Sequence, residues 1–206
     1  MTKASVLVEF VGSYGEDRAH FGKAGDVDII IIADGAGGTS GGEEAAEAVV
    51  SMLKEHFSMH EAPSDPMELE KLFRGIDLKL RLDPVAGEST GILVILTERY
   101  FLGVSAGDSE AWLFSDEFDL ELTKFQSRKP LLGTGKAVPV GFGPYERMGK
   151  LLVGSDGVFD FLEAPEIRKI VTTEPTEDAP KTLLRQIRLS NGELPDDFAA
   201  VVLSLT

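Results

Sequence analysis

Uninterrupted apolar runs along the chain predict the strands of a sheet. Residues 28–33 (DIIIIA) form the clearest run, and its length suits a strand that is buried on both faces. Residues 6–11, broken only by Glu9, predict an N-terminal strand. Further runs predict strands at 91–97, 100–105, 111–114, 150–154 and 198–205. Glu98-Arg99 and Gly107-Asp108 have turn character, so residues 91–114 are expected to form an antiparallel meander.

Other segments repeat their apolar residues at helical spacing. In residues 43–57, apolar positions recur every three or four residues and predict an amphipathic helix. A second helix is expected after Asp65-Pro66, because an acidic N-cap, a proline in the first turn and Glu68 form a start signal. Two later helices are expected at 165–172 and 178–189, whereas the glycine- and proline-rich segment 125–147 predicts a loop.

The order of these elements is strands, two helices, strands, two helices and a last strand. This order lacks the strict alternation of a doubly wound parallel sheet. It favours an α+β fold in which helices cover antiparallel sheet, and 206 residues suit one domain.

Composition narrows the possible partners. The net charge of -15 disfavours binding to nucleic acid and to anionic membranes, since phosphate groups repel such a surface. The chain has no cysteine, which excludes disulfides, thiolate metal sites and thiol nucleophiles. No run approaches eighteen apolar residues and the N-terminus lacks a leader-like apolar stretch, so a cytoplasmic protein without a membrane span is expected.

Acidic residues recur at the ends of the predicted strands. Each one alone is typical of a turn, because aspartate next to glycine is common turn chemistry. Together they would converge if the strands are neighbours, and converging carboxylates repel unless protons or cations neutralise them. Ligand sets made only of oxygen atoms suit Mg²⁺ or Mn²⁺. These residues are Glu16, Asp17, Asp34, Asp108, Asp156, Asp196 and Asp197.

Five short motifs carry these acids in a fixed order. They are GED (15–17), ADGAGG (33–38), GDSEAW (107–112), SDGVFD (155–160) and DDFAAVV (196–202). In this order they resemble the motifs of the metal-dependent protein serine/threonine phosphatases, the protein phosphatase 2C family. The small-residue-rich strand ESTGILVIL (88–96) is similar to the family's as well. The resemblance implies a four-layer α-β-β-α sandwich of two antiparallel sheets flanked by helix pairs, as a single domain over 1–206 with a shortened flap.

The resemblance also implies which residues hold metal. Asp34 would bridge two Mg²⁺ or Mn²⁺ ions. Asp156 and Asp196 would hold the first ion, and Glu16 with the backbone carbonyl of Gly35 would hold the second.

Three further acids have implied roles near these ions. Asp17 would hydrogen-bond a water on the metal and so count, with Asp34 and Asp156, among the catalytic residues. Asp108 and Asp160 fall where some members build a third, weaker metal site together with Asp156. The implied reaction is hydrolysis of phosphoserine or phosphothreonine in proteins by a metal-bridged hydroxide, without a covalent phosphoenzyme.

The sequence departs from the family pattern at several positions. The arginine that usually grips the substrate phosphate is replaced by Gly12, so the substrate-binding residue is unknown. Arg18 lies nearby in sequence and is expected to be a surface residue. Asp197 stands where an asparagine is common, and Ala36 where many eukaryotic members have histidine. Only a compact segment, 142–148, remains of the flap.

Three alternatives compete with this interpretation. The loop at 35–42 follows a strand and precedes a helix, as a dinucleotide-binding loop does, but its third glycine position is Ser40. The segment 131–137 is similar to a phosphate-binding loop, but Pro130 and Ala137 replace required residues. The third alternative is a phosphatase-like regulatory or binding module with weak or no activity. The preferred hypothesis is an active phosphatase in signalling, with a phosphoprotein substrate and a serine/threonine kinase as its counterpart.

Overall fold

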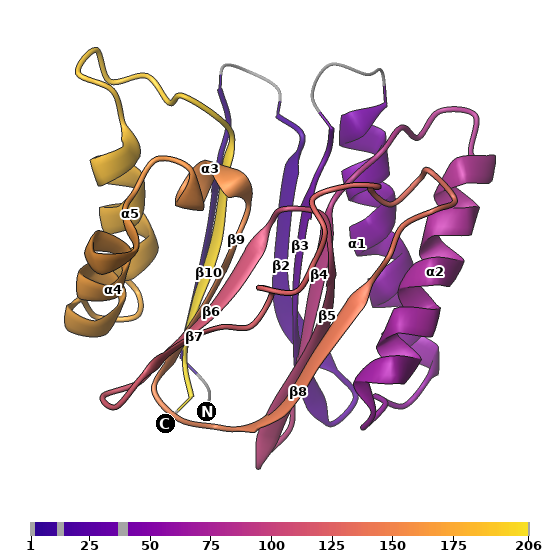
Figure 1. Cartoon of the computed structure of the whole chain (residues 1–206), viewed down its shortest axis with the longest axis horizontal. Helices are drawn as coiled ribbons and strands as arrows, with labels where there is room; N and C mark the ends of the chain where they lie inside the picture. The colour runs from indigo at the N-terminus through magenta and orange to yellow at the C-terminus, as the bar shows by residue number, and fades with distance from the viewer. Residues whose placement is uncertain (1–2, 12–14, 37–40, 206) are drawn as a thin grey trace.

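The computed structural model describes residues 3–11, 15–36 and 41–205. They form two five-stranded antiparallel sheets that pack face to face, with helices on both outer faces (Figure 1).

The first sheet has the order β1-β10-β9-β6-β7. Its strands are β1 (Ala4–Glu9), β6 (Glu110–Phe114), β7 (Asp119–Glu121), β9 (Lys150–Gly154) and β10 (Phe198–Ser204). The second has the order β2-β3-β4-β5-β8. Its strands are β2 (Asp17–Ala24), β3 (Val27–Asp34), β4 (Gly91–Leu96), β5 (Tyr100–Ala106) and β8 (Val140–Glu146).

Helix pairs cover the two sheets from outside (Figure 1). Helices α1 (Gly42–Met59) and α2 (Pro66–Leu82) pack on the second sheet, and α4 (Ala164–Thr173) and α5 (Ala179–Ile187) pack on the first. The short helix α3 (Asp156–Phe159) follows β9. Asp65 caps α2 as expected, since its side chain accepts a hydrogen bond from the backbone N–H of Met67 across 2.9 Å. The predicted four-layer α-β-β-α sandwich is confirmed.

Strand β3 shows why an uninterrupted apolar run was needed. Ile30 and Ile32 face the core between the sheets, whereas Ile29 and Ile31 face the core beneath α1 and α2. All four isoleucines are buried, because alternate side chains of a strand point to opposite faces. The same double burial applies to β4, whose six residues are all buried. These two central strands fix the position of the residues that follow them.

The sequence prediction missed the two edge strands of the second sheet. No strand was predicted for residues 17–24, which form β2, and the last part of the predicted loop at 125–147 is β8. The VGFGPYE sequence of β8 contains two glycines and a proline, which an edge strand tolerates because one side of it has no partner strand. The meander was also wrong at its end: β5 pairs with β4 and β8, whereas β6 belongs to the other sheet and pairs with β7 and β9.

Within the described residues, no helix is both long enough and apolar enough to span a bilayer.

Candidate metal centre

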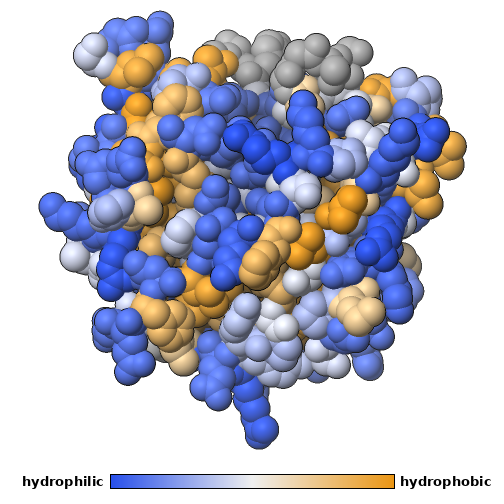
Figure 2. Space-filling model, viewed as in Figure 1, coloured by the Kyte–Doolittle hydropathy of each residue, from blue (hydrophilic) through white to orange (hydrophobic). Residues whose placement is uncertain are grey.

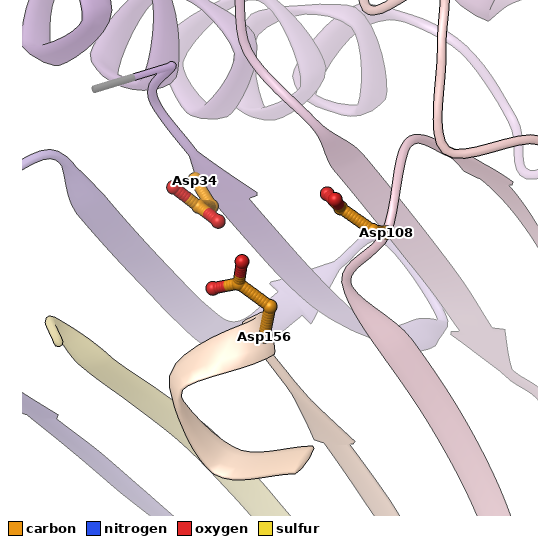
Figure 3. A group of neighbouring side chains, drawn as sticks. All are labelled: Asp34, Asp108 and Asp156. Atoms are coloured by element: carbon orange, nitrogen blue, oxygen red, sulfur yellow. The ribbon is translucent and has the colours of Figure 1, made fainter. Parts of the chain in front are cut away.

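Three aspartates from separate parts of the chain meet at one edge of the sandwich. Asp34 ends β3, Asp108 lies in the connection from β5 to β6, and Asp156 begins α3 directly after β9. Each offers a carboxylate oxygen, and these three oxygens lie within 4.8 Å of one another. Figure 3 shows the three side chains pointing toward a common point. Asp34 is part of the second sheet and Asp156 follows a strand of the first, so both sheets contribute to the group.

Hydrogen bonds to small hydroxyl residues fix the backbone of Asp34. Its N–H donates to Oγ1 of Thr90 across 3.0 Å, and the N–H of Thr90 donates to the carbonyl oxygen of Asp34 across 2.8 Å. The hydroxyl of Ser89 donates to the same carbonyl oxygen across 3.0 Å. Oγ1 of Thr90 also lies 2.7 Å from the hydroxyl oxygen of Ser109, the residue after Asp108. The threonine therefore connects the segments that carry two of the three acids.

Asp17 lies beneath this group and is 1% exposed. It is the direct partner of Asp34 in the antiparallel pairing of β2 with β3. The hydroxyl of Ser155 donates to Oδ2 of Asp17 across 2.6 Å, and the same hydroxyl oxygen accepts from the N–H of Ala199 across 3.1 Å. Asp17 and Ser155 belong to different sheets, so this bond joins the sheets next to the acids.

The carboxyl groups of the centre are poorly solvated and repel one another. Burial raises the pKa of Asp34, and the neighbouring charges of Asp17 and Asp156 raise it further. Burial also raises the pKa of Asp17, while the hydrogen bond from Ser155 opposes the rise. The pKa of Asp156 rises to about 6 through burial, followed by the charges of Asp108 and Asp196. Such a group of oxygen donors fits hard divalent cations, because a cation removes the repulsion that protons otherwise relieve.

The other predicted ligands surround this group without joining it as closely. Glu16 is half-buried, and burial raises the pKa of its carboxyl, with Asp197 as the largest charge contribution. The carbonyl oxygen of Glu16 accepts from the N–H of Gly35 across 3.2 Å. Asp196 and Asp160 are exposed, and the charges of both raise the pKa of Asp156. The N–H of Asp160 donates to the carbonyl oxygen of Asp156 across 2.8 Å.

Gly42 leaves room for the carboxylate of Glu16, because glycine has no Cβ atom. A Cβ atom on Gly42 would lie 2.5 Å from Oε1 of Glu16, which is closer than real Cβ contacts allow. Gly35 is crowded in the same way, since its Cβ would lie 2.3 Å from the carbonyl oxygen of Gly42. The glycines after β3 therefore let the start of α1 approach the acids closely.

Asp197 has a structural role that the sequence did not reveal. Its two carboxylate oxygens accept from the backbone N–H groups of Val11 and Glu16, each across 2.7 Å. Asp197, at the start of β10, therefore holds both ends of the connection between β1 and β2. The sequence showed only that Asp197 stands where the family commonly has asparagine, and no local pattern indicates a partner some 180 residues away.

Arginine side chains lie at two sides of the centre. Gly12, the position of the absent arginine, is outside the described residues. Arg18 is not free to bind a phosphate, because it is paired with Glu43 and Glu47 at 2.8 and 2.9 Å. Nε and Nη2 of Arg128 each lie 3.0 Å from Oδ2 of Asp108. Sequence analysis did not single out Arg128, since its segment was read only as a loop.

The alternative phosphate-binding loop is excluded by an internal carboxylate. Asp77 of α2 is 3% exposed and accepts hydrogen bonds from the backbone N–H groups of Gly133, Gly135 and Ala137. These are the donors that a phosphate would need. For the other alternative, residues 37–40 of the glycine loop lie outside the described residues.

Comparisons with known proteins agree with the motifs. The sequence model of the family described as protein phosphatase 2C matches residues 10–125. A curated relative from Saccharomyces cerevisiae, protein phosphatase 2C homolog 2, is 32% identical over an alignment 158 residues long, with 70% of this chain and 33% of the yeast protein covered. The chain thus spans about a third of that relative's length.

Solved structures share the fold over the full chain. A bacterial serine phosphatase has a TM-score of 0.85 and 17% identity, with 100% of this chain and 98% of that one covered. The catalytic domain of the serine threonine protein phosphatase PstP, in complex with two manganese ions, has a TM-score of 0.77 and 19% identity, with 98% and 97% covered. The corresponding values for Stp1 from Staphylococcus aureus are 0.80 and 16%, with 99% and 95% covered.

Proposed function

Because the chain belongs to the protein phosphatase 2C family, we propose that it is a Mg²⁺- or Mn²⁺-dependent phosphatase acting on phosphoserine and phosphothreonine in proteins. The observation that carries the proposal is the convergence of Asp34, Asp108 and Asp156, whose carboxylate oxygens lie within 4.8 Å of one another. The two manganese ions of the structurally similar PstP domain support the choice of metal.

Each acid has a proposed place in the centre. Asp34 reaches the group from the second sheet and is proposed to bridge two ions. Asp156 and Asp196 would complete the first ion's ligands, and both precede or follow strands of the first sheet. Glu16 and the carbonyl oxygen of Gly35 would hold the second ion. The N–H of Gly35 donates to the Glu16 carbonyl, so these two ligands are already tied to each other.

Asp108 and Asp160 are proposed to hold a third, weaker ion together with Asp156. The Asp108 carboxylate is neutralised by Arg128 in the structure, and Asp160 is exposed. A cation at this position would therefore have to displace the guanidinium or share Asp108 with it. This competition supports a weaker affinity than at the two inner positions.

The chain's own residues would orient the reaction. The bound ions would lower the pKa of a bound water to near neutrality, and they would neutralise charge on the phosphoryl oxygens. Asp17 is proposed to orient that water, because the hydrogen bond from Ser155 holds its carboxyl beside Asp34 at the base of the acid group. The buried setting strengthens each of these interactions, since little water screens them. The absence of cysteine agrees with direct attack by water rather than a thiol-based phosphoenzyme.

The domain, partner and location assignments belong to the same proposal. Residues 1–206 are proposed to act as one catalytic domain with a shortened flap, because both sheets supply the acids and separate parts could not form the centre. A phosphoprotein is the proposed substrate, with a serine/threonine kinase opposing the activity. The charge of -15 and the lack of cysteine support a cytoplasmic signalling protein that binds neither nucleic acid nor membrane.

Hydrolysis assays test the proposal. p-Nitrophenyl phosphate and a phosphothreonine peptide are incubated with the protein and Mn²⁺, Mg²⁺ or EDTA. Turnover is expected with either metal and is expected to stop in EDTA. Metal binding in calorimetry without any turnover would favour the regulatory-module alternative, and absence of both would reject the metal centre.

A further inference from the structure

A second cleft lies next to the proposed metal centre. It has a volume of about 380 Å³ and lies between β6 and the segment that runs from α3 into α4. Trp112, Phe159 and Phe161 supply aromatic surface to it, and Phe161 is 43% exposed. On this face of the molecule, apolar surface in the area of α3 and α4 is flanked by hydrophilic residues (Figure 2). The cleft therefore offers exposed aromatic rings to a ligand in solution.

The aromatic wall is held in place before any ligand arrives. Nε1 of Trp112 donates to Oε2 of Glu110 across 2.6 Å. The Trp112 ring also stacks on Phe114, with ring centroids 6.0 Å apart and an angle of 10° between the planes. Both contacts fix the orientation of the indole ring. A preorganised aromatic face lowers the entropic cost of binding.

Acidic residues line the same cleft. Glu110, Glu163 and Glu166 lie around the aromatic rings, and Asp160 is on the side of the metal centre. Among the described residues that line it, none is a lysine, arginine or histidine. Aromatic faces surrounded by carboxylates attract a side chain that is both cationic and extended, and arginine binds such faces best because its guanidinium is planar.

The short helix α3 sets the distance between the cleft and the metal centre. Asp156 at its start belongs to the centre, and Phe159 at its end lines the cleft. A helix rises 1.5 Å per residue, and the side chains add several Å, so the two sites are about 7–10 Å apart. An extended peptide covers that distance in about two to three residues.

We propose that this cleft is a specificity site that binds a basic side chain, preferably arginine, two or three residues from the phosphorylated serine or threonine of the substrate. The inference rests on the proposed function, because it places the phosphoryl group at the metal centre. It adds the class of substrate: phosphoproteins whose modified residue lies in a basic sequence.

Matched phosphothreonine peptides test the preference. They differ only in carrying arginine or glutamate two or three residues from the phosphothreonine, on either side. For the unmodified protein, kcat/KM is expected to be about five- to tenfold higher for the best arginine peptide than for its glutamate counterpart. In the double variant Glu163→Gln/Glu166→Gln, this ratio is expected to fall below about threefold.

A second double variant controls for net charge. Glu55→Gln/Glu61→Gln also removes two negative charges, but near the C-terminal end of α1. This variant is expected to keep the preference for the arginine peptide. Hydrolysis of p-nitrophenyl phosphate, which has no peptide to occupy the cleft, is expected to stay unchanged in both variants. Equal rates on both peptides, or an undiminished preference in the Glu163/Glu166 variant, would overturn the inference while p-nitrophenyl phosphate turnover still supported the phosphatase.

Fluorescence gives a readout that needs no catalysis. The chain has one tryptophan, so its emission reports the cleft wall directly. An unphosphorylated arginine peptide is expected to change Trp112 emission in a saturable way. The matching glutamate peptide is expected to leave the emission unchanged. The response is expected to weaken in Glu163→Gln/Glu166→Gln and to persist in Glu55→Gln/Glu61→Gln. Unchanged emission with the arginine peptide would contradict occupation of the cleft.

Discussion

Ser155 donates its hydroxyl hydrogen to Asp17 across 2.6 Å and thereby ties the two sheets together beside the acid group. Both side chains are buried, at 0% and 1% exposure. Replacing Ser155 by alanine leaves Asp17 and the N–H of Ala199 without this partner. We expect Ser155→Ala to lower the free energy of unfolding by about 1–3 kcal/mol. Chemical denaturation of the metal-free protein measures this loss, and an unchanged midpoint would show that the bond contributes little.

Asp34 and Asp156 are expected to be required for turnover and to destabilise the protein when no metal is bound. Asn at either position keeps the shape but removes a ligand charge, so Asp34→Asn and Asp156→Asn should abolish hydrolysis. The same changes remove repulsion within the acid group. The metal-free variants should therefore melt a few degrees higher than the unmodified protein. Full activity in either variant would reject the two-metal assignment.

The metal-free protein is expected to lose stability as the pH rises. Folding raises the pKa of Asp156 to about 6, and raises those of Asp17 and Asp34, mainly through burial. A carboxyl group with a raised folded pKa binds more protons in the folded than in the unfolded state, so its stability contribution is lost as pH rises through the folded pKa. The decline should begin near pH 4 and continue past pH 6. Melting curves in EDTA measure it, and saturating Mn²⁺ should remove most of it.

Arg128 is expected to compete with a cation for Asp108. Its guanidinium contacts Asp108 through two nitrogens, and the side chain is 69% exposed. Arg128→Ala frees the carboxylate, so the weakest metal-binding step should become several-fold tighter while the tighter steps keep their affinity. Calorimetric titration with Mn²⁺ separates these steps. Arg74→Ala removes an exposed arginine that pairs with Glu70 on α2, and it should leave all of them unchanged.

Asp77 is expected to matter for stability rather than for chemistry. It is buried and binds three backbone N–H groups of the loop at 133–137. Removing the carboxylate leaves these donors without partners, and each unsatisfied buried donor costs about 1–3 kcal/mol. Asp77→Ala should therefore be among the most destabilising single changes, as measured by its melting temperature. A small loss of stability would indicate that water replaces the carboxylate.

The central part of the fold could be predicted because its signals are local. The isoleucines of β3, the N-cap of α2 and the spacing of apolar residues in α1 each determine their element within a short window. Strands β2 and β8 could not be read in this way. They lie at the two edges of their sheet, and their sequences are half-exposed and mixed in character. Their structure depends on pairing with β3 and β5, which no local window contains.

The same limit applies to the candidate site. The acids at strand ends could be found because each follows or precedes a strong apolar run. The partners that orient them could not, because Asp197 with Glu16 and Ser155 with Asp17 are distant in sequence. Arg128 was missed since nothing in its loop indicates contact with Asp108. The acids' proximity is a consequence of which strand ends the sandwich places at one edge.

The acid group draws on both sheets, and this has a consequence for ion size. Asp34 belongs to one sheet and Asp156 follows a strand of the other, so we expect the separation of their oxygens to depend on the thickness of the apolar layer between the sheets. Ile32 and Val153 are part of that layer. Mg²⁺ requires short metal–oxygen bonds and a nearly ideal octahedron, whereas larger cations such as Ca²⁺ accept longer bonds and a more variable geometry. The apolar packing of the interior would thus determine which cation radius the proposed metal centre accepts.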